Sequence, residues 1–208
     1  MGVELTPIAK PEYDYIAKTG TREGFVQPIF DKPYEIELPL TLEELKANGV
    51  KYAVGASHWR VDYPDTPSRD ASMNAVINEC FRQQMWLACD KRVTILGHPW
   101  YNSRKLWFHD FSLIPRSMNL EIGAALKENK KYVECNSGYL FSPAVSEKYR
   151  MQYVEFIREL FEMGVPVTHG SDSHHQYLEH REKLEQCLKA VGFKDDEFSD
   201  IKEADFWG

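Results

Sequence analysis

The sequence lacks several features that would define its class at once. No apolar run approaches the length of a membrane span and no signal peptide opens the chain, so we expect a cytoplasmic protein with no membrane partner. No basic stripe is present, since 25 Lys and Arg residues stand against 32 Asp and Glu residues, and this balance argues against a nucleic-acid partner. The four cysteines form no Cys-x-x-Cys pair, which favours reduced, buried thiols over a zinc-thiolate site.

What is present indicates one folded domain over residues 1–208. The chain is 43% hydrophobic and 13% aromatic, which is typical of a packed globule and not of a disordered segment. No internal repeat, low-complexity tract or linker divides it. A chain of this length can bury about 70% of the surface that it exposes when unfolded.

Apolar, strand-like runs alternate with segments of helical periodicity. The expected strands are residues 51–58, 93–98, 131–136 and 165–170, and the expected helices are residues 70–91, 120–130, 145–163 and 177–191. Gly164 ends the third of these helices at the usual C-terminal position. Such alternation predicts an α/β fold with a parallel sheet, in which functional residues gather at the carboxyl ends of the strands. The irregular stretch 101–116 is long enough to cover a site there.

Side chains that can ligate metals stand at these strand ends. His58 and His98 each close a strand, and Asp172 and His174 follow another strand two residues apart, so that both leave the same face of an extended segment. A single histidine in such a place is more often a hydrogen-bonded core residue. Three strand ends that carry such groups together favour a metal site, because packing alone does not need imidazoles at equivalent positions.

Glu134 and Asn136 also lie two residues apart at the end of an expected strand, and they share a face. We expect both side chains to form hydrogen bonds with the ligating imidazoles and so to orient them. The alternative for Asn136 is a turn-forming role, because Ser137 and Gly138 follow it directly.

Five segments carry a resemblance to a known family. They are Gly2-Val3-Glu4, Val54-Gly55-Ala56-Ser57-His58-Trp59, Ile95-Leu96-Gly97-His98-Pro99, Tyr132-Val133-Glu134-Cys135-Asn136-Ser137 and Gly170-Ser171-Asp172-Ser173-His174. In this order they resemble the motifs of the polymerase and histidinol phosphatase (PHP) family of metal-dependent phosphoesterases. The resemblance covers nearly the whole chain and implies a TIM-like (β/α)7 barrel of parallel strands. It implies five metal ligands: Glu4, His58, His98, Asp172 and His174. It also implies a catalytic role for Glu4 and Asp172. In the family, the residue that Glu4 matches bridges two metals.

The chain departs from the family's pattern at its start. The family's barrel opens with a His-x-His strand, whereas this sequence contains no His-x-His and begins almost at Glu4. By the resemblance, Glu4, His58 and His98 complete one metal position, while Asp172 and His174 each belong to a position that lacks its other histidines. We therefore expect a barrel incomplete at the N-terminus: a truncated product, a chain completed by another polypeptide, or a degenerate site. Exposed sheet edges would then favour a homo-oligomer or association with such a partner chain.

These observations predict a metal-dependent hydrolase that acts on phosphate monoesters of a small phosphorylated metabolite. Mixed carboxylate and imidazole ligands suit divalent Zn, Mn or Fe. Arg60 and Arg104 are candidates for bidentate binding of phosphate oxygens, and Asn136 is a third candidate for substrate binding. For Arg104 a solvated surface charge is the alternative. Two other interpretations stay open: a catalytically degenerate PHP remnant that serves as a binding or regulatory module, and a metal-dependent amidohydrolase.

Overall fold

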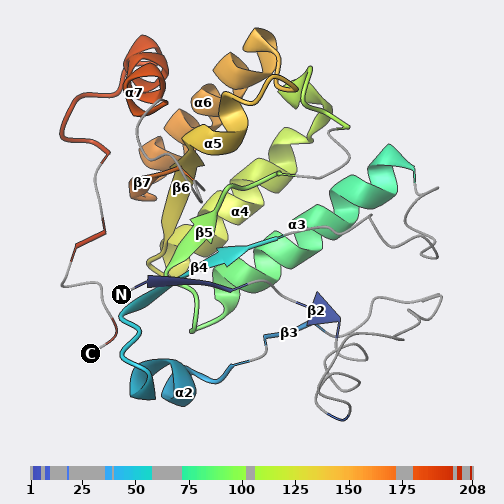
Figure 1. The fold of residues 1–208 in the computed structure, drawn as a ribbon. Coiled ribbons are helices and arrows are strands. Elements are labelled where there is room, and N and C mark those ends of the chain that lie inside the picture. Colours follow the sequence, from blue (N-terminus) through green and yellow to red (C-terminus); the bar gives the residue numbers. More distant parts are fainter. Residues whose placement is uncertain are drawn as a thin grey trace.

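The computed structural model contains a five-stranded parallel sheet and a layer of helices (Figure 1). It describes residues 2–5, 8–9, 18, 36–38, 40–57, 72–101, 106–171, 180–198, 201–202 and 207. The strands of this sheet are β1 (Gly2–Leu5), β4 (Tyr52–Ala56), β5 (Ile95–Gly97), β6 (Tyr132–Asn136) and β7 (Val167–Gly170). A separate antiparallel pair is formed by β2 (Ile8–Ala9) and β3 (Ile36–Glu37). The helices are α2 (Leu42–Ala47), α3 (Met73–Cys89), α4 (Arg116–Glu128), α5 (Ser137–Leu140), α6 (Glu147–Glu162), α7 (Arg181–Ala190) and the 3₁₀ helix η2 (Phe111–Leu113).

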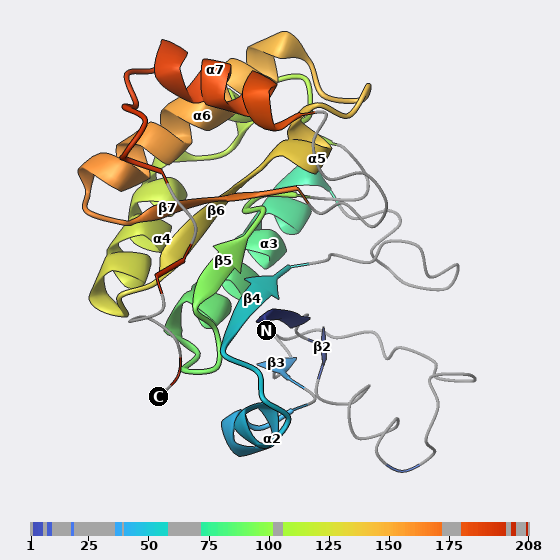
Figure 2. The same ribbon diagram turned by 60° about the vertical axis from the view of Figure 1, so that its left-hand side comes forward.

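The sheet winds in one direction only. Its spatial order, β1-β4-β5-β6-β7, is also the order along the chain, and every neighbouring pair is parallel. Because crossovers between parallel strands are right-handed, a run without reversal puts all its connecting helices on the same face. Helices α3, α4 and α6 accordingly lie side by side on one face, with α7 against α6 (Figures 1 and 2).

This winding is the one found in α/β barrels, but the sheet is open over the residues that the structure describes. It ends at β1 on one side. On the other side, beyond β7, Val167 makes an isolated parallel bridge to Phe198. The expected α/β fold with a parallel sheet is confirmed, and closure into a barrel is not.

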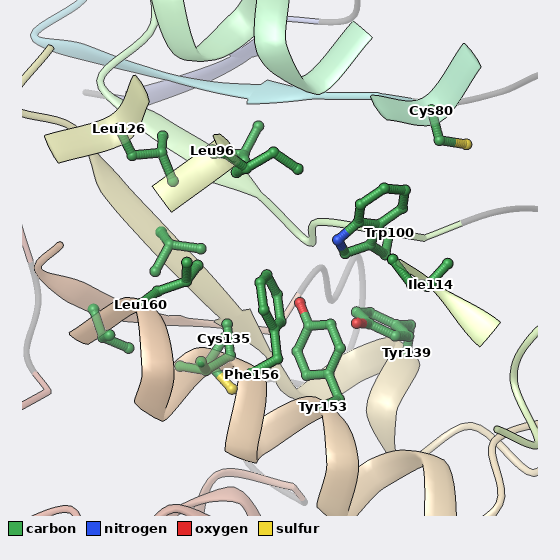
Figure 3. Close-up of a cluster of buried hydrophobic side chains, with 14 of the residues drawn as sticks. Cys80, Leu96, Trp100, Ile114, Leu126, Cys135, Tyr139, Tyr153, Phe156 and Leu160 are labelled. Carbon is green, nitrogen blue, oxygen red and sulfur yellow. The ribbon is translucent and has the colours of Figure 1, made fainter. Parts of the chain in front are cut away.

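The hydrophobic core lies between the sheet and the helical layer (Figure 3). Leu96 of β5 and Cys135 of β6 contribute to it from the sheet, and both are fully buried. The helices contribute large side chains from α4 and α6, among them Leu126, Tyr153 and Leu160. Because side chains alternate along a strand, a core position at Cys135 leaves its two neighbours on the opposite face of the sheet.

All four expected strand–helix units are present. The strands begin one or two residues inside the expected limits; β4 and β5 also end one or two residues early, whereas β6 and β7 end at the expected residue. The third helix ends before Gly164, whose φ is +95°. Five apolar residues of the expected helix 145–163 recur at helical spacing, which predicts that they face the core. Tyr149, Tyr153, Ile157 and Leu160 are fully buried, and Phe161 is partly buried. Hydrophobic periodicity therefore predicted these elements correctly.

Several details differ from the expectation. Helix α4 begins at Arg116 and not at residue 120. Met73 shares the helical spacing of the apolar residues in the expected helix 70–91, which predicts burial, but it is the first residue of α3 and is 37% exposed. Cys89 is exposed, although Cys80 and Cys135 are buried and all four cysteines are free. Among the described helices, none is long and apolar enough to span a membrane.

The elements β2, β3, α5 and η2 were not predicted, and neither was α2, for which the sequence contains a signal. Helix α2 starts with a capping box, in which the Thr41 hydroxyl accepts from the Glu44 amide and the Glu44 carboxylate accepts from the Thr41 amide. The pattern Thr-x-x-Glu before a helix is visible in the sequence alone.

Candidate functional site

The chain makes a strained turn where β5 leaves the sheet. His98, at the carboxyl end of this strand, has a φ of +25°, and Trp100 has a φ of +64°. Both side chains are buried, at 3% and 1% exposure. The amide of Tyr101 donates to the carbonyl of His98 at 3.1 Å and closes the turn. A positive φ is unusual for residues other than glycine, most of all for bulky ones, and costs about 1–3 kcal/mol for each such residue.

Side chains from three surrounding elements hold this turn in place. The His98 amide donates to Oε2 of Glu134 on β6 at 2.8 Å, and the Trp100 amide donates to Oε1 of Gln84 on α3 at 3.1 Å. The Trp100 indole N–H donates to Oδ1 of Asn119 on α4 at 2.8 Å. Strained backbone persists only where its surroundings over-determine it, and such places concentrate at functional sites.

Glu134 reaches from one strand end to another. Its Oε2 accepts the His98 amide beyond β5, while its Oε1 lies 1.5 Å from the position that a Cβ on Gly170, the last residue of β7, would take. A Cβ on Gly97 would lie 3.6 Å from Oε2. The carboxylate thus occupies space that exists because residue 170 has no side chain. We expected Glu134 to bond an imidazole, and the hydrogen bond that the structure shows with His98 is to the backbone amide.

Asn136 ends β6 and starts the short helix α5. Its side chain is fully buried, and its Oδ1 accepts the Tyr139 amide at 3.3 Å, so the turn-forming role is realised. Its Nδ2 is also buried and has no hydrogen-bond acceptor among the residues that the structure describes. A buried amide donor without a partner needs an explanation, and a bound anion or substrate oxygen would satisfy it.

An aromatic wall lines the turn on the α5 side. The rings of His98 and Tyr101 meet edge to face with centroids 5.3 Å apart, and Tyr101 meets Tyr139 in the same way at 5.7 Å. The Tyr139 hydroxyl donates to the carbonyl of Pro99 at 3.5 Å. Burial raises the pKa of Tyr139 well above its ordinary value, so the phenol stays a neutral donor.

Glu4 lies on β1, the edge strand of the sheet over the described residues, and is exposed. It pairs with Val54, which pairs with Ile95, which pairs with Tyr132. Neighbours in register point to the same face, and residues two apart along a strand do as well. Glu4, Glu134 and Asn136 therefore share the face opposite the helical layer.

The other predicted site residues lie outside the described residues. They are His58, Arg60, Arg104, Asp172 and His174. The strand ends that lead to two of them are described: Ser57, whose hydroxyl donates to Gln83 at 2.6 Å, follows β4, and Ser171 follows β7. Within the described part of the chain, no group of three His, Cys, Asp or Glu side chains could hold a metal ion. Of the five expected ligands, the structure describes Glu4 and His98.

Sequence reasoning missed the residues that hold the turn from behind. Gln84 is 1% exposed and Asn119 is 5% exposed, and both lie on helices that face the sheet. The available signal was a pair of polar residues, Gln83 and Gln84, which interrupt the apolar face of the expected helix 70–91. Buried polar side chains of this kind need partners and so mark a backbone that has to be held.

Comparisons with known proteins agree with this fold. No protein-family model and no curated protein sequence matches the chain significantly. Among solved structures, the chain is similar to histidinol phosphate phosphatase from Lactococcus lactis subsp. lactis, crystallised with zinc, L-histidinol and phosphate. The TM-score is 0.56 at 17% identity, and the match covers 73% of this chain and 60% of that chain. The chain thus spans less than two thirds of the phosphatase. At this identity the likeness establishes the fold.

Proposed function

We propose that the protein is a metal-dependent hydrolase of phosphate monoesters, acting on a small phosphorylated metabolite. The observation that carries the proposal is the His98 turn. There a buried imidazole lies at the carboxyl end of a parallel strand, on a strained backbone that a hydrogen bond to the Glu134 side chain holds in place. Functional residues of parallel α/β sheets lie at that end of the strands. The likeness in fold to a phosphatase crystallised with zinc and phosphate supports the same reaction class.

The proposed site has the PHP arrangement that the sequence motifs imply. The five ligands would be Glu4, His58, His98, Asp172 and His174, around one cavity of a (β/α)7 barrel, with Zn, Mn or Fe as the metal. A bound divalent metal supplies Lewis-acid polarisation of a phosphoryl oxygen.

The chain's own residues would bind and orient the substrate. Arg60 and Arg104 are proposed to bind phosphate oxygens through their planar forks. The Nδ2 group of Asn136 is a buried donor on the same face as Glu4 and Glu134, and it is suited to donate a hydrogen bond to a substrate oxygen. The aromatic wall of Tyr101 and Tyr139 limits the access of water to His98.

The experiment is a pair of measurements on purified protein. Metal content is determined by elemental analysis after incubation with Zn²⁺ or Mn²⁺, and hydrolysis of an aryl phosphate is followed with each metal and with a chelator. We expect stoichiometric metal and chelator-sensitive release of phosphate. Metal binding without hydrolysis would favour the binding-module alternative, and release of ammonia from amides without phosphate release would favour an amidohydrolase.

We also propose that the chain associates, either with itself or with a partner chain that completes the barrel. Its support is the edge strand β1, which is paired on one side only among the described residues. Light scattering over a concentration series tests this, and a monomer at all concentrations would contradict the homo-oligomer.

A further inference from the structure

The backbone pairing of β5 with β6 ends one residue before β5 itself ends at Gly97. A side-chain hydrogen bond follows in its place. The last paired residues are Leu96 and Val133, although β6 goes on to pair with β7 as far as Asn136 and Gly170. Beyond that point the His98 amide donates to the carboxylate of Glu134 at 2.8 Å. The carboxylate thus replaces a backbone carbonyl where β5 turns away from the sheet.

The same carboxylate sits against the end of β7. Its Oε1 lies 1.5 Å from where a Cβ of Gly170 would be, and its Cγ lies 2.8 Å from that point. No side chain larger than hydrogen fits at Gly170 while Glu134 keeps this position, because real Cβ atoms do not approach other heavy atoms so closely. The two residues are therefore matched in shape across β6 and β7.

Burying a carboxylate in this space costs free energy, because the charge loses its hydration. Glu134 is 9% exposed, and an apolar side chain of the same size would avoid the desolvation of a carboxylate. A carboxylate does provide a stronger acceptor for a backbone amide than a neutral group. Accepting the His98 amide is thus a role that a carboxylate fills and that an apolar side chain of the same size does not.

We propose that Glu134 is a positioning residue that couples the ends of β5 and β7. It holds His98 in its left-handed backbone conformation, and through its contact with Gly170 it fixes the distance from that turn to the strand end after which Asp172 and His174 follow. The inference rests on the proposed function for its role in metal binding, and on the geometry alone for its effect on His98.

The first test measures hydrogen exchange at the His98 amide by NMR, relative to the amide of Val133 within the same sheet. Glu134→Ala removes the acceptor and is expected to lower the relative protection of His98 about tenfold or more. Glu134→Gln keeps an acceptor oxygen and is expected to keep most of the protection. Asp90→Asn is the matched control, because the Asp90 carboxylate also accepts a backbone amide at 2.8 Å, that of Arg92, at the opposite, amino end of the sheet. Unchanged protection in Glu134→Ala would overturn the proposal.

The second test is a double-mutant cycle between Gly170→Ala and Glu134→Ala, with unfolding by urea as the measurement. The methyl group of Gly170→Ala displaces the carboxylate and so weakens its bond to the His98 amide. We therefore expect a larger loss of stability in the wild-type background than in the background where Glu134 is alanine. Equal losses in both backgrounds would show that the two residues are not coupled. If Gly170→Ala alone is too unstable to measure, the cycle remains informative, because the double variant is then expected to recover folding.

A third measurement separates this inference from the proposed function. We expect Glu134→Ala to lower zinc affinity about 10- to 100-fold, with Glu134→Gln closer to wild type and Asp90→Asn unchanged. If the wild type neither binds zinc nor hydrolyses an aryl phosphate, the proposed function fails while the exchange and the cycle still decide the positioning role. If the wild type binds zinc and Glu134→Ala binds it equally well, the positioning role fails and the proposed function stands.

Discussion

The two ends of the parallel sheet both bury polar side chains, but they use them differently. At the amino end, Lys131 directly before β6 is 4% exposed, and its ammonium donates to the carbonyls of Asp90 and Val93. Arg92 binds both carboxylate oxygens of Asp90 and also donates to the carbonyl of Leu40 at 3.1 Å. Each charge there has partners within the chain, and they tie the segment before α2 to the sheet.

At the carboxyl end, polar side chains hold a strained backbone turn, and one buried amide donor lacks an acceptor among the described residues. His98 and Trp100 have positive φ, and Asn136 carries a buried donor that finds no acceptor in the described part of the chain. The amino end has a positive φ as well, at Lys130, but this residue follows α4 in the ordinary left-handed position of a helix end. The polar groups at the amino end are thus paired within the chain, whereas those at the carboxyl end hold a strained turn and include one donor that lacks an acceptor among the described residues. The proposed function places its chemistry at the carboxyl end.

The largest expected difference between the two ends concerns metal binding. We predict that His98→Ala abolishes binding of Zn²⁺ or Mn²⁺, a larger loss than the about 100-fold seen on removing groups that merely orient ligands. Elemental analysis and competition with a chromophoric chelator measure it. The matched control is His109→Ala, which removes an exposed imidazole. Unchanged metal content in His98→Ala would contradict the proposal that His98 binds a metal at the carboxyl end of the sheet.

The next effect concerns the ion pair at the amino end. The side chains of Arg92 and Asp90 are 14% and 12% exposed, with 2.5 Å between Nη2 and Oδ2. Burial alone would raise the pKa of Asp90, but the hydrogen bonds and charge of Arg92 hold it below its ordinary value. Arg92→Met leaves this carboxylate without its cation, so we expect a loss of about 3 kcal/mol in the free energy of unfolding.

Urea unfolding measures the effect of Arg92→Met, and zinc affinity is measured on the same sample. We expect the affinity to stay at the wild-type value, because the ion pair lies at the far end of the sheet. A variant of normal stability with weakened zinc binding would reverse the assignment of the two ends.

The buried lysine gives the amino end a pH dependence. Burial lowers the pKa of Lys131 to about 8, and Asp90 opposes this in part. The unfolded lysine titrates near its ordinary value of about 10.4, so between the two values the unfolded chain binds more protons than the folded chain. Stability should therefore rise with pH across this window, by on the order of 2 kcal/mol.

Urea midpoints of the wild type and of Lys131→Met, compared at several pH values from 7 to 10.5, isolate this contribution. The difference between the two proteins should shift in favour of the wild type as the pH rises. A difference that stays constant would mean that the folded lysine keeps its ordinary pKa.

The smallest expected effect returns to the strained turn. Trp100→Phe keeps the ring in the core and leaves Oδ1 of Asn119 without its indole donor, which should cost about 1–2 kcal/mol. Thermal and urea unfolding measure the loss. Trp86→Phe is the control, since the ring that faces Arg92 is retained there as an aromatic face. Equal effects of the two substitutions would mean that the indole hydrogen bond contributes nothing to the turn.

Local patterns predicted the repeating elements well, and they failed where contacts are distant in sequence. The apolar face of α6 and the end of that helix before Gly164 follow from periodicity and backbone preference, which depend on neighbours within a few residues. The bond between Glu134 and the His98 amide joins residues 36 positions apart. No local pattern specifies it, and for the same reason Gln84 and Asn119 were not recognised as parts of the site.

The amino-acid sequence alone determined the alternation of strands and helices, the parallel sheet and the placement of His98, Glu134 and Asn136 at its carboxyl end. These follow because side-chain periodicity and strand polarity are properties of short segments. Only the folded chain decided that Glu134 holds the His98 amide, that Gly170 makes room for the carboxylate, and that both His98 and Trp100 take left-handed backbone conformations. Packing between elements that are remote in sequence fixes those features, because only it supplies the partners that compensate a strained backbone.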